Sequence, residues 1–427
     1  MQLSGKGAVQ NHFVTMVRCP RVVLFSFALY YKSWYNRGEV ICVNVVVAID
    51  SFKGSLTSLQ AGYAVKEAVL KLDAEAEVYV RPLADGGEGT VAALSALPDA
   101  EIVELAVAGP LMDTVKANYC IVHNKKLAII EIAEAAGHHL LSKEQLDPMR
   151  TTTFGVGQLI ADAIEKGCRN FLVGLGGSAT NDGGAGMLQA LGYSLLDRCG
   201  KAVVKGARGL EDLHYISDVN ALPELKECRF RVACDVKNPL CGDDGCSSVF
   251  APQKGATPDS IYQMDDWLSR FAYLAREMEP TADPDMPGAG AAGGLGFAFA
   301  TFLKATLEPG IDIVLQETNL ESYVAEADIV VTGEGRLDRQ TVMGKAPVGV
   351  AKLAKQYGKT VIAFSGCATQ DAEVCNAHGI DAFFPILRQP ATLQEAIDPK
   401  NAYQNLKDTA YQVFRLLYLS QKENEPD

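Results

Sequence analysis

Residues 174–186 read GLGGSATNDGGAG and lie between a short apolar run, 170–175, and a helical run, 187–191. At a turn from a strand to a helix, glycine N–H groups can point into a cleft, where they and the helix N-terminus favour negative charge. A glycine-rich turn can also be a tight connection that requires positive φ angles, and this stretch alone fits both interpretations. Its polar members supply hydroxyl donors and ligands for a metal or a substrate hydroxyl: Ser178, Thr180, Asn181 and Asp182.

From residue 43 onward, short apolar segments alternate with longer amphipathic ones. Residues 43–49 form an almost continuous β-branched run, which is typical of a strand buried on both faces of a parallel sheet. A helix is expected from the N-cap residues at 55–58 to about Lys71. The other segments expected are strands at 77–83, 168–175, 230–234, 327–332 and 360–365, and a helix at 347–357. The alternation predicts an α/β protein whose largely parallel sheets are flanked by helices.

Composition narrows the class of protein. The chain has 427 residues, more than one ordinary core holds, so two domains are expected. Hydrophobic residues make up 48 % and charged residues 21 %, which is a globular composition. The formal net charge is −13 and no run of Lys or Arg forms a basic patch, which argues against nucleic acid as a partner. Eleven cysteines occur without a CxxC pair, as expected of a reduced cytoplasmic protein.

Residues 1–42 differ from the rest of the chain. Their apolar run at 22–31 is shorter than the roughly 20 residues that cross a bilayer, and no small-residue cleavage pattern follows it. No other stretch reads as transmembrane. We expect 1–42 to be a poorly ordered extension or a mis-assigned start, with synthesis beginning near Val43. The intact mass of the native protein tests this expectation.

Polar clusters that contain glycine follow several predicted strands: DSFKGS at 50–55, ADGGEGT at 84–90 and TGEGRLD at 332–338. Because ligands of parallel α/β sheets bind beyond the carboxyl ends of the strands, these loops and 174–186 predict one composite site. Lys53 can neutralise a phosphate or a carboxylate. Asp85 and Glu88 can face the cleft as oxygen ligands of Mg²⁺. Taken singly, each of these side chains would be interpreted as a solvated surface group.

Acidic residues beside glycine turns, with isolated Lys and Arg among them, suit phosphoryl transfer. That reaction needs cations around the phosphoryl oxygens and a carboxylate for the attacking hydroxyl. The chain has no GxxxxGK[ST] and no GxGxxG followed by an acid, so neither a P-loop nor a dinucleotide site is predicted. Residues 279–294, rich in Pro and Gly, are interpreted as a hinge and a further glycine turn before an apolar helix. The pair His138 and His139 fits a surface loop or a ligand.

Five motifs, in this order, resemble the two-domain glycerate kinases of the glycerate 2-kinase type, which are unrelated to P-loop glycerate kinases. The motifs are AIDSFKGS at 48–55, ADGGEGT at 84–90, the stretch 174–186, PGAGAAGGLG at 287–296, and TGEGRLD at 332–338 with Gln340, Gly344 and Lys345. The resemblance runs from about Val43 to about Phe384 and on towards the C-terminal helix. Residues 1–42 have no counterpart in the family, and Ile49 stands where the family often has proline.

The resemblance implies two α/β domains around a central cleft, one discontinuous (43–84 with 288–427) and one inserted (85–287). It implies transfer of a phosphoryl group from ATP, with Mg²⁺, to glycerate, usually giving 2-phosphoglycerate. The partners implied are glycerate and ATP, with no nucleic acid and no membrane, and a homo-oligomer stays open.

Within the motifs we expect the catalytic base to be Asp182, ahead of Asp338 and Asp50. Lys53 and Arg336 are expected to meet the glycerate carboxylate or the transferred phosphoryl group. The residues expected to bind the nucleotide are Gly176, Gly177, Ser178, Thr180, Asn181, Gly293, Gly294 and Ser55, and the expected metal ligands are Asp85, Glu88 and Glu334. Three alternatives remain: a kinase of another small hydroxy acid or polyol, a kinase of the 3-hydroxyl of glycerate, and a non-catalytic nucleotide-binding module. A non-catalytic module would be expected to have lost acidic residues from these motifs, whereas the acidic residues of the motifs are all present.

Overall fold

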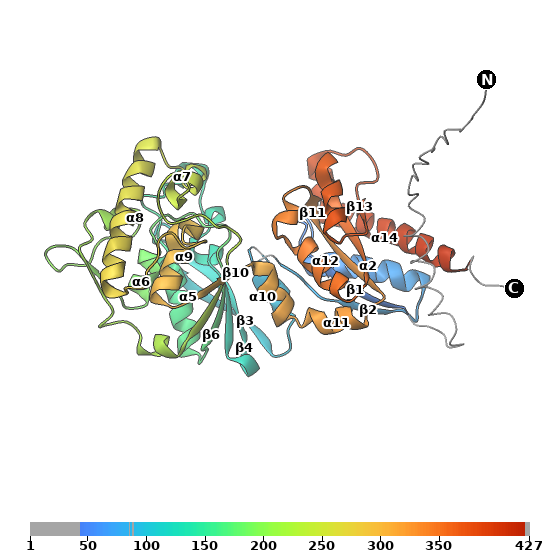
Figure 1. The fold of residues 1–427 in the computed structure, drawn as a ribbon, viewed down its shortest axis with the longest axis horizontal. Coiled ribbons are helices and arrows are strands. Elements are labelled where there is room, and N and C mark those ends of the chain that lie inside the picture. Colours follow the sequence, from blue (N-terminus) through green and yellow to red (C-terminus); the bar gives the residue numbers. More distant parts are fainter. Residues whose placement is uncertain (1–42, 85, 88, 423–427) are drawn as a thin grey trace, which may run out of the picture. The chain divides into compact units, whose positions relative to one another are not determined.

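The computed structural model describes residues 43–84, 86–87 and 89–422 (Figure 1). The expectations for 1–42, and those for Asp85 and Glu88, therefore lie outside the described residues. Within the described ranges, no helix is both long enough and apolar enough to cross a bilayer.

The first sheet has five parallel strands in the order β13-β12-β11-β1-β2. Their bounds are β1 Asn44–Ile49, β2 Glu77–Val80, β11 Ile329–Leu337, β12 Thr360–Ala368 and β13 Ala382–Pro385. The strands predicted at 43–49, 77–83, 327–332 and 360–365 are all present in this sheet. The prediction of parallel pairing is confirmed here.

Both faces of the five-stranded sheet are buried, because the β-branched run of β1 sends alternate side chains to opposite sides. Val45 and Val47 share one core with helices α2 (Ser58–Leu72) and α14 (Pro399–Lys422). Val46 and Ala48 share the other with α10 (Gly310–Glu317) and α12 (Ala346–Gln356). Helix α2 begins after Thr57, whose side chain accepts a hydrogen bond from the Gln60 backbone in a capping box.

The second sheet has six strands in the order β10-β9-β6-β5-β4-β3. Their bounds are β3 Ala100–Ala108, β4 Thr114–Val122, β5 Leu127–Glu131, β6 Asn170–Gly174, β9 Arg229–Ala233 and β10 Thr306–Glu308. Strands β5, β6, β9 and β10 are parallel, whereas β3, β4 and β5 pair antiparallel, which the sequence analysis did not predict. The helices that share its core include α5 (Phe154–Glu165), α6 (Ala185–Ala190), α8 (Pro258–Met278) and α9 (Ala291–Phe302).

Two predicted boundaries differ from the structure. Strand β11 continues through the GEGRL letters of TGEGRLD, expected as a loop, because its pairing with β12 extends to Leu337 opposite Ala368. The predicted boundary at residue 287 groups α9 and β10 with the five-stranded sheet, whereas β10 pairs with β9 in the six-stranded sheet. The division of the chain into domains itself stays a prediction.

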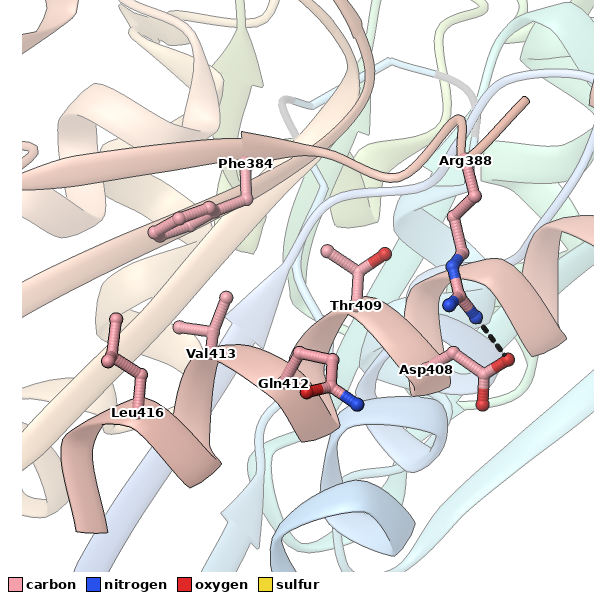
Figure 2. A pocket seen from close by; sticks show the side chains of 7 residues that line it. All are labelled: Phe384, Arg388, Asp408, Thr409, Gln412, Val413 and Leu416. Carbon is pink, nitrogen blue, oxygen red and sulfur yellow. Dashed lines mark hydrogen bonds and ion pairs between the residues drawn. The ribbon is translucent and has the colours of Figure 1, made fainter. Parts of the chain in front are cut away.

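A groove with a volume of about 370 Å³ lies along α14 and the end of β13 (Figure 2). Phe384, Val413 and Leu416 supply its apolar side chains, and Arg388 Nη1 lies 2.6 Å from Asp408 Oδ2 at its polar end. None of the predicted site residues lines this groove.

Candidate active site

The turn at 174–186 connects β6 to α6 and is held by a second glycine turn. Gly183 and Gly184 adopt φ angles of 63° and 78°. The Gly183 N–H donates a 2.9 Å hydrogen bond to the carbonyl of Gly293. A Cβ atom on Gly293 would overlap the carbonyl oxygen of Thr180, and one on Gly294 would lie 2.8 Å from the Gly183 Cα. Gly293 and Gly294, predicted to bind nucleotide, are buried and pack against the back of the turn.

Asp182 lies inside the protein with none of its surface exposed. Its Oδ2 accepts hydrogen bonds from the Thr153 N–H at 2.9 Å and the Gly186 N–H at 3.2 Å, and Oδ1 accepts one from the Gly184 N–H at 3.1 Å. The hydroxyls of Thr152 and Thr153 also donate to this carboxylate. Burial raises the pKa of Asp182, while these donors favour its charged form. The arrangement makes Asp182 an internal acceptor that shapes the turn.

The exposed side of the same turn lines a cavity of about 640 Å³. Part of its wall comes from residues at or beyond the ends of parallel strands: Lys53 after β1, 86–87 after β2, 175–178 after β6, and 233–236 at and after the end of β9. A Cβ atom on Gly174 would overlap the carbonyl oxygen of Gly86, so two of the predicted motifs touch at this wall. Of the residues predicted for the composite site, Lys53, Gly176, Gly177 and Ser178 therefore line one cavity.

Three further predicted nucleotide ligands do not line the cavity. Thr180 and Asn181 have no exposed surface, and Asn181 Nδ2 donates to Ser247 Oγ at 2.8 Å. Ser55 does not line it either, and its N–H donates to the Phe52 carbonyl at 2.7 Å. The structure assigns Asn181 to the support of the turn.

Lys254 lines the cavity although none of the sequence motifs contains it. It ends the 3-10 helix η7 (Pro252–Lys254), lines the cavity and is 3 % exposed. Its ammonium group donates to Ser178 Oγ at 2.9 Å and to the Thr180 carbonyl at 2.7 Å. Burial lowers the pKa of Lys254 to about 8, although the nearby Asp182 carboxylate acts in the opposite direction. No spacing in the sequence signals this contact, because 76 residues separate Lys254 from Ser178.

His138 also belongs to the cavity, so the alternative of a ligand stays open for it. It begins the 3-10 helix η3 (His138–Leu140), and both its N–H and its Nδ1 lie within hydrogen-bond distance of the Gly177 carbonyl, at 3.0 and 2.9 Å. Its side chain is exposed and lines the cavity. His139 next to it does not line the cavity.

A second group of polar side chains lies on one face of the five-stranded sheet, at its carboxyl edge. Glu334 is 8 % exposed, and its Oε1 accepts a 2.6 Å hydrogen bond from the Thr341 hydroxyl. Its Oε2 lies 3.4 Å from Lys345 Nζ, and burial raises the pKa of Glu334. Asp50 is 5 % exposed, and its N–H donates to the Gly333 carbonyl at 2.9 Å. By strand register, Asp50 and Glu334 share a face of the sheet.

Arg336 and Asp338 form an ion pair at the end of β11, with Arg336 Nε 3.3 Å from Asp338 Oδ2. The Arg336 side chain is 62 % exposed, whereas that of Asp338 is 15 % exposed. Gly335, between Glu334 and Arg336, lies against the Lys53 loop, since a Cβ atom on it would be 3.5 Å from the Lys53 nitrogen. The backbone of the Lys53 loop therefore runs beside the backbone of β11 at Gly335, and Lys53 itself lines the cavity.

The donors near Glu334 are suited to a hard cation. The hydroxyl oxygens of Thr332 and Ser365 are buried without a hydrogen-bond partner among the described residues, and both share the sheet face of Glu334 by register. Within the described ranges, no group of three or more His, Cys, Asp or Glu residues is placed to hold a metal ion.

Comparison with known proteins gives one consistent result. A family model described as the glycerate kinase family matches residues 45–418. A glycerate kinase of Halalkalibacterium halodurans is 46 % identical over 83 % of this chain and 93 % of its own length. The glycerate 2-kinase of Escherichia coli K12 is 44 % identical over 85 % of this chain and 95 % of its own. A crystal structure from Salmonella typhimurium LT2, assigned as glycerate kinase 2, superposes with a TM-score of 0.82 at 42 % identity and covers 90 % of this chain and 100 % of its own.

Proposed function

Because the chain belongs to the glycerate kinase family, we propose that it transfers the γ-phosphoryl group of ATP to the 2-hydroxyl of glycerate and releases 2-phosphoglycerate and ADP. The chain is an enzyme that phosphorylates glycerate, and kinase activity implies ATP as the co-substrate. The observation that carries the proposal is the cavity lined by Gly176, Gly177 and Ser178 together with Lys53. It combines backbone donors and a cation, which is what phosphoryl transfer between two anions requires.

In this reaction the hydroxyl oxygen of glycerate attacks the γ-phosphorus atom. The bond from that phosphorus to the bridging oxygen breaks, ADP leaves with the electron pair, and the hydroxyl proton passes to a carboxylate. The N–H groups of Gly176 and Gly177 would hold phosphate oxygens. Lys53 and Arg336 would neutralise the glycerate carboxylate or the transferred group, because both side chains are cationic and their backbones meet at Gly335.

We propose Asp50 as the carboxylate that accepts the proton. Asp182, favoured by the motif alone, is enclosed, and five donors already occupy its oxygens. Asp50 and Asp338 both accept hydrogen bonds from nearby N–H groups, Asp50 from Ser51 at 2.6 Å and Asp338 from Gln340 at 2.8 Å, so these bonds do not distinguish the two carboxylates. Asp50 lies three residues before Lys53, on the sheet face that carries Glu334.

Glu334 would hold Mg²⁺, and the motif at 84–90 would supply Asp85 and Glu88 as further ligands. When bound there, the ion would neutralise charge on the phosphoryl oxygens. We also propose a cytoplasmic location, which the nine described cysteines support because all of them are unpaired thiols. Cell fractionation tests the location.

An assay of ADP release tests the function. The enzyme is incubated with Mg²⁺-ATP and, in separate arms, glycerate, tartronate semialdehyde, glycerol or hydroxypyruvate. We expect the highest kcat/KM with glycerate and a product whose ³¹P spectrum is that of 2-phosphoglycerate. A 3-phosphoglycerate spectrum would correct the position of transfer. A higher kcat/KM with another acceptor would assign a different substrate.

A further inference from the structure

The ammonium group of Lys254 is held inside the protein without an ion-pair partner among the described residues. Burying a charge is unfavourable unless hydrogen bonds or an opposite charge offset it. Two of its three N–H bonds are satisfied by neutral oxygens, those of Ser178 and Thr180. A buried cation at a cavity wall, paired only with neutral groups, is suited to an anion that arrives with a ligand.

The backbone at Lys254 is held in place by a hydrogen bond and by close packing of the next residue. Its N–H donates to the Ala251 carbonyl at 2.9 Å. The next residue, Gly255, has a φ of 96°, and a Cβ atom there would overlap the carbonyl oxygen of Leu146. The close packing behind the lysine directs the chain so that Lys254 reaches the glycine turn.

The hydrogen bond from Lys254 also sets the direction of the Ser178 hydroxyl. An ammonium group can only donate, so Ser178 Oγ is the acceptor in this pair. The hydroxyl proton of Ser178 must then point to another acceptor. Because Ser178 lines the cavity, a ligand oxygen in the cavity can accept that proton.

The backbone next to Ser178 offers three more donors. Among the described residues, the N–H groups of Gly176, Gly177 and Ser178 make no hydrogen bond to the protein, whereas the following N–H, that of Ala179, donates to the Ala136 carbonyl at 2.8 Å. Consecutive N–H groups that point outward at a turn form a concave site for an anion. All three residues line the same cavity as Lys254.

We propose that Lys254 supplies the positive charge of an oxyanion-binding site whose other donors are the Ser178 hydroxyl and the N–H groups of Gly176, Gly177 and Ser178. The ligand is an oxyanion, either a phosphate of the nucleotide or the carboxylate of the acceptor acid. Assigning it a place in catalysis rests on the proposed function, whereas the binding itself does not.

The test measures binding by isothermal titration calorimetry, without turnover, using ADP, glycerate and inorganic phosphate as separate probes. Lys254→Met should weaken the binding of one probe by about tenfold or more, the usual size of a lost charge-assisted hydrogen bond. Loss for ADP and phosphate assigns a nucleotide phosphate, and loss for glycerate alone assigns the carboxylate. Lys226→Met, which removes an exposed lysine of η6 (Pro223–Glu227), should leave all three affinities unchanged.

A second variant keeps the test decisive if Lys254→Met does not fold. Ser178→Asp places a carboxylate beside the ammonium group of Lys254, so the cation gains a permanent partner and the site repels other anions. We expect a folded protein, as judged by circular dichroism, that no longer binds the oxyanion. Wild-type affinity in Ser178→Asp, or in folded Lys254→Met, overturns the proposal. If the wild-type protein binds ADP through Lys254 but phosphorylates no glycerate, the proposed function fails and this inference stands.

Discussion

The N–H group of Gly183 and the carbonyl group of Gly293 are joined by a 2.9 Å hydrogen bond, so the two glycine turns form one packed unit. One turn faces the cavity with residues 176–178, and the other supports it from behind. The support needs glycine because the backbones approach too closely for a side chain.

Replacement of Gly293 by alanine should destabilise the protein strongly. Gly293 has a φ of 69°, and an added Cβ atom would overlap the carbonyl oxygen of Thr180. We expect the free energy of unfolding in urea to fall by roughly 2–4 kcal/mol, from backbone strain and overpacking. Gly200→Ala is the matched control, since Gly200 has a φ of 75° but nothing within 4 Å of the added atom. A similar loss in both variants would contradict a role for close packing at Gly293.

Asp182→Asn should act on stability rather than on the chemical step. An amide nitrogen would face N–H donors, including those of Thr153 and Gly184, so we expect a loss of roughly 2–4 kcal/mol in the free energy of unfolding. The kcat of the folded fraction should stay within about tenfold of the wild-type value, well short of the usual loss of a general base. A kcat lowered by several orders of magnitude with unchanged stability would restore the base role predicted from the motif.

Asp50→Asn should lower kcat by roughly 10²–10⁴-fold, the usual contribution of a general base, with a much smaller change in the KM for ATP. The measurement is steady-state kinetics with saturating Mg²⁺-ATP. Asp338→Asn serves as the comparison, because Asp338 is the other carboxylate of the motifs that remains a candidate for the base. A larger loss of kcat in Asp338→Asn than in Asp50→Asn would reverse the assignment.

Lys53→Ala should raise the KM for glycerate or lower kcat, because the cavity loses a cation that faces an anionic substrate. We expect kcat/KM to fall by about tenfold or more. Lys237→Ala removes an exposed lysine close in sequence to the cavity wall but not part of it, and should change neither constant. Unchanged kcat and KM in Lys53→Ala would exclude the proposed contact.

Oxyanion affinity should fall as the pH rises through about 8. Lys254 must be protonated to bind an anion, and burial lowers its pKa to about 8. Sulfate is the probe, since it keeps its charge throughout this range. Among the residues that the structure describes, the other titratable groups near Lys254 or in the cavity are Asp182, Cys246, Lys53, His138, Cys234 and Asp235. In Lys254→Arg, which stays charged, any affinity that remains should not decline near pH 8; the same decline would assign it to another group.

The sequence predicted the strands at 43–49 and 168–175 because a β-branched or apolar run buried on both faces has little other explanation. The predicted end of strand β11 was wrong, because Gly333 and Gly335 are typical of a loop, whereas the pairing with β12 continues through them. The antiparallel strands β3 and β4 were missed, since register between strands is a tertiary property.

The sequence predicted only some of the residues that line the cavity. Lys53, Gly176, Gly177 and Ser178 were recognised from motifs at strand ends, where topology alone brings loops together. The roles of Asp182 and Lys254 depend on partners far along the chain. Asp182 is enclosed by Thr153, 29 residues earlier, and Lys254 contacts Thr180, 74 residues earlier. Motif spacing carries no information on such contacts.

The turn at 174–186 takes its final form late in biosynthesis. Its hydrogen bonds to Lys254 and Gly293 cannot form until the ribosome has made and released those residues. Throughout that interval the turn lacks these two contacts, and incompletely folded nascent chains are prone to misfolding.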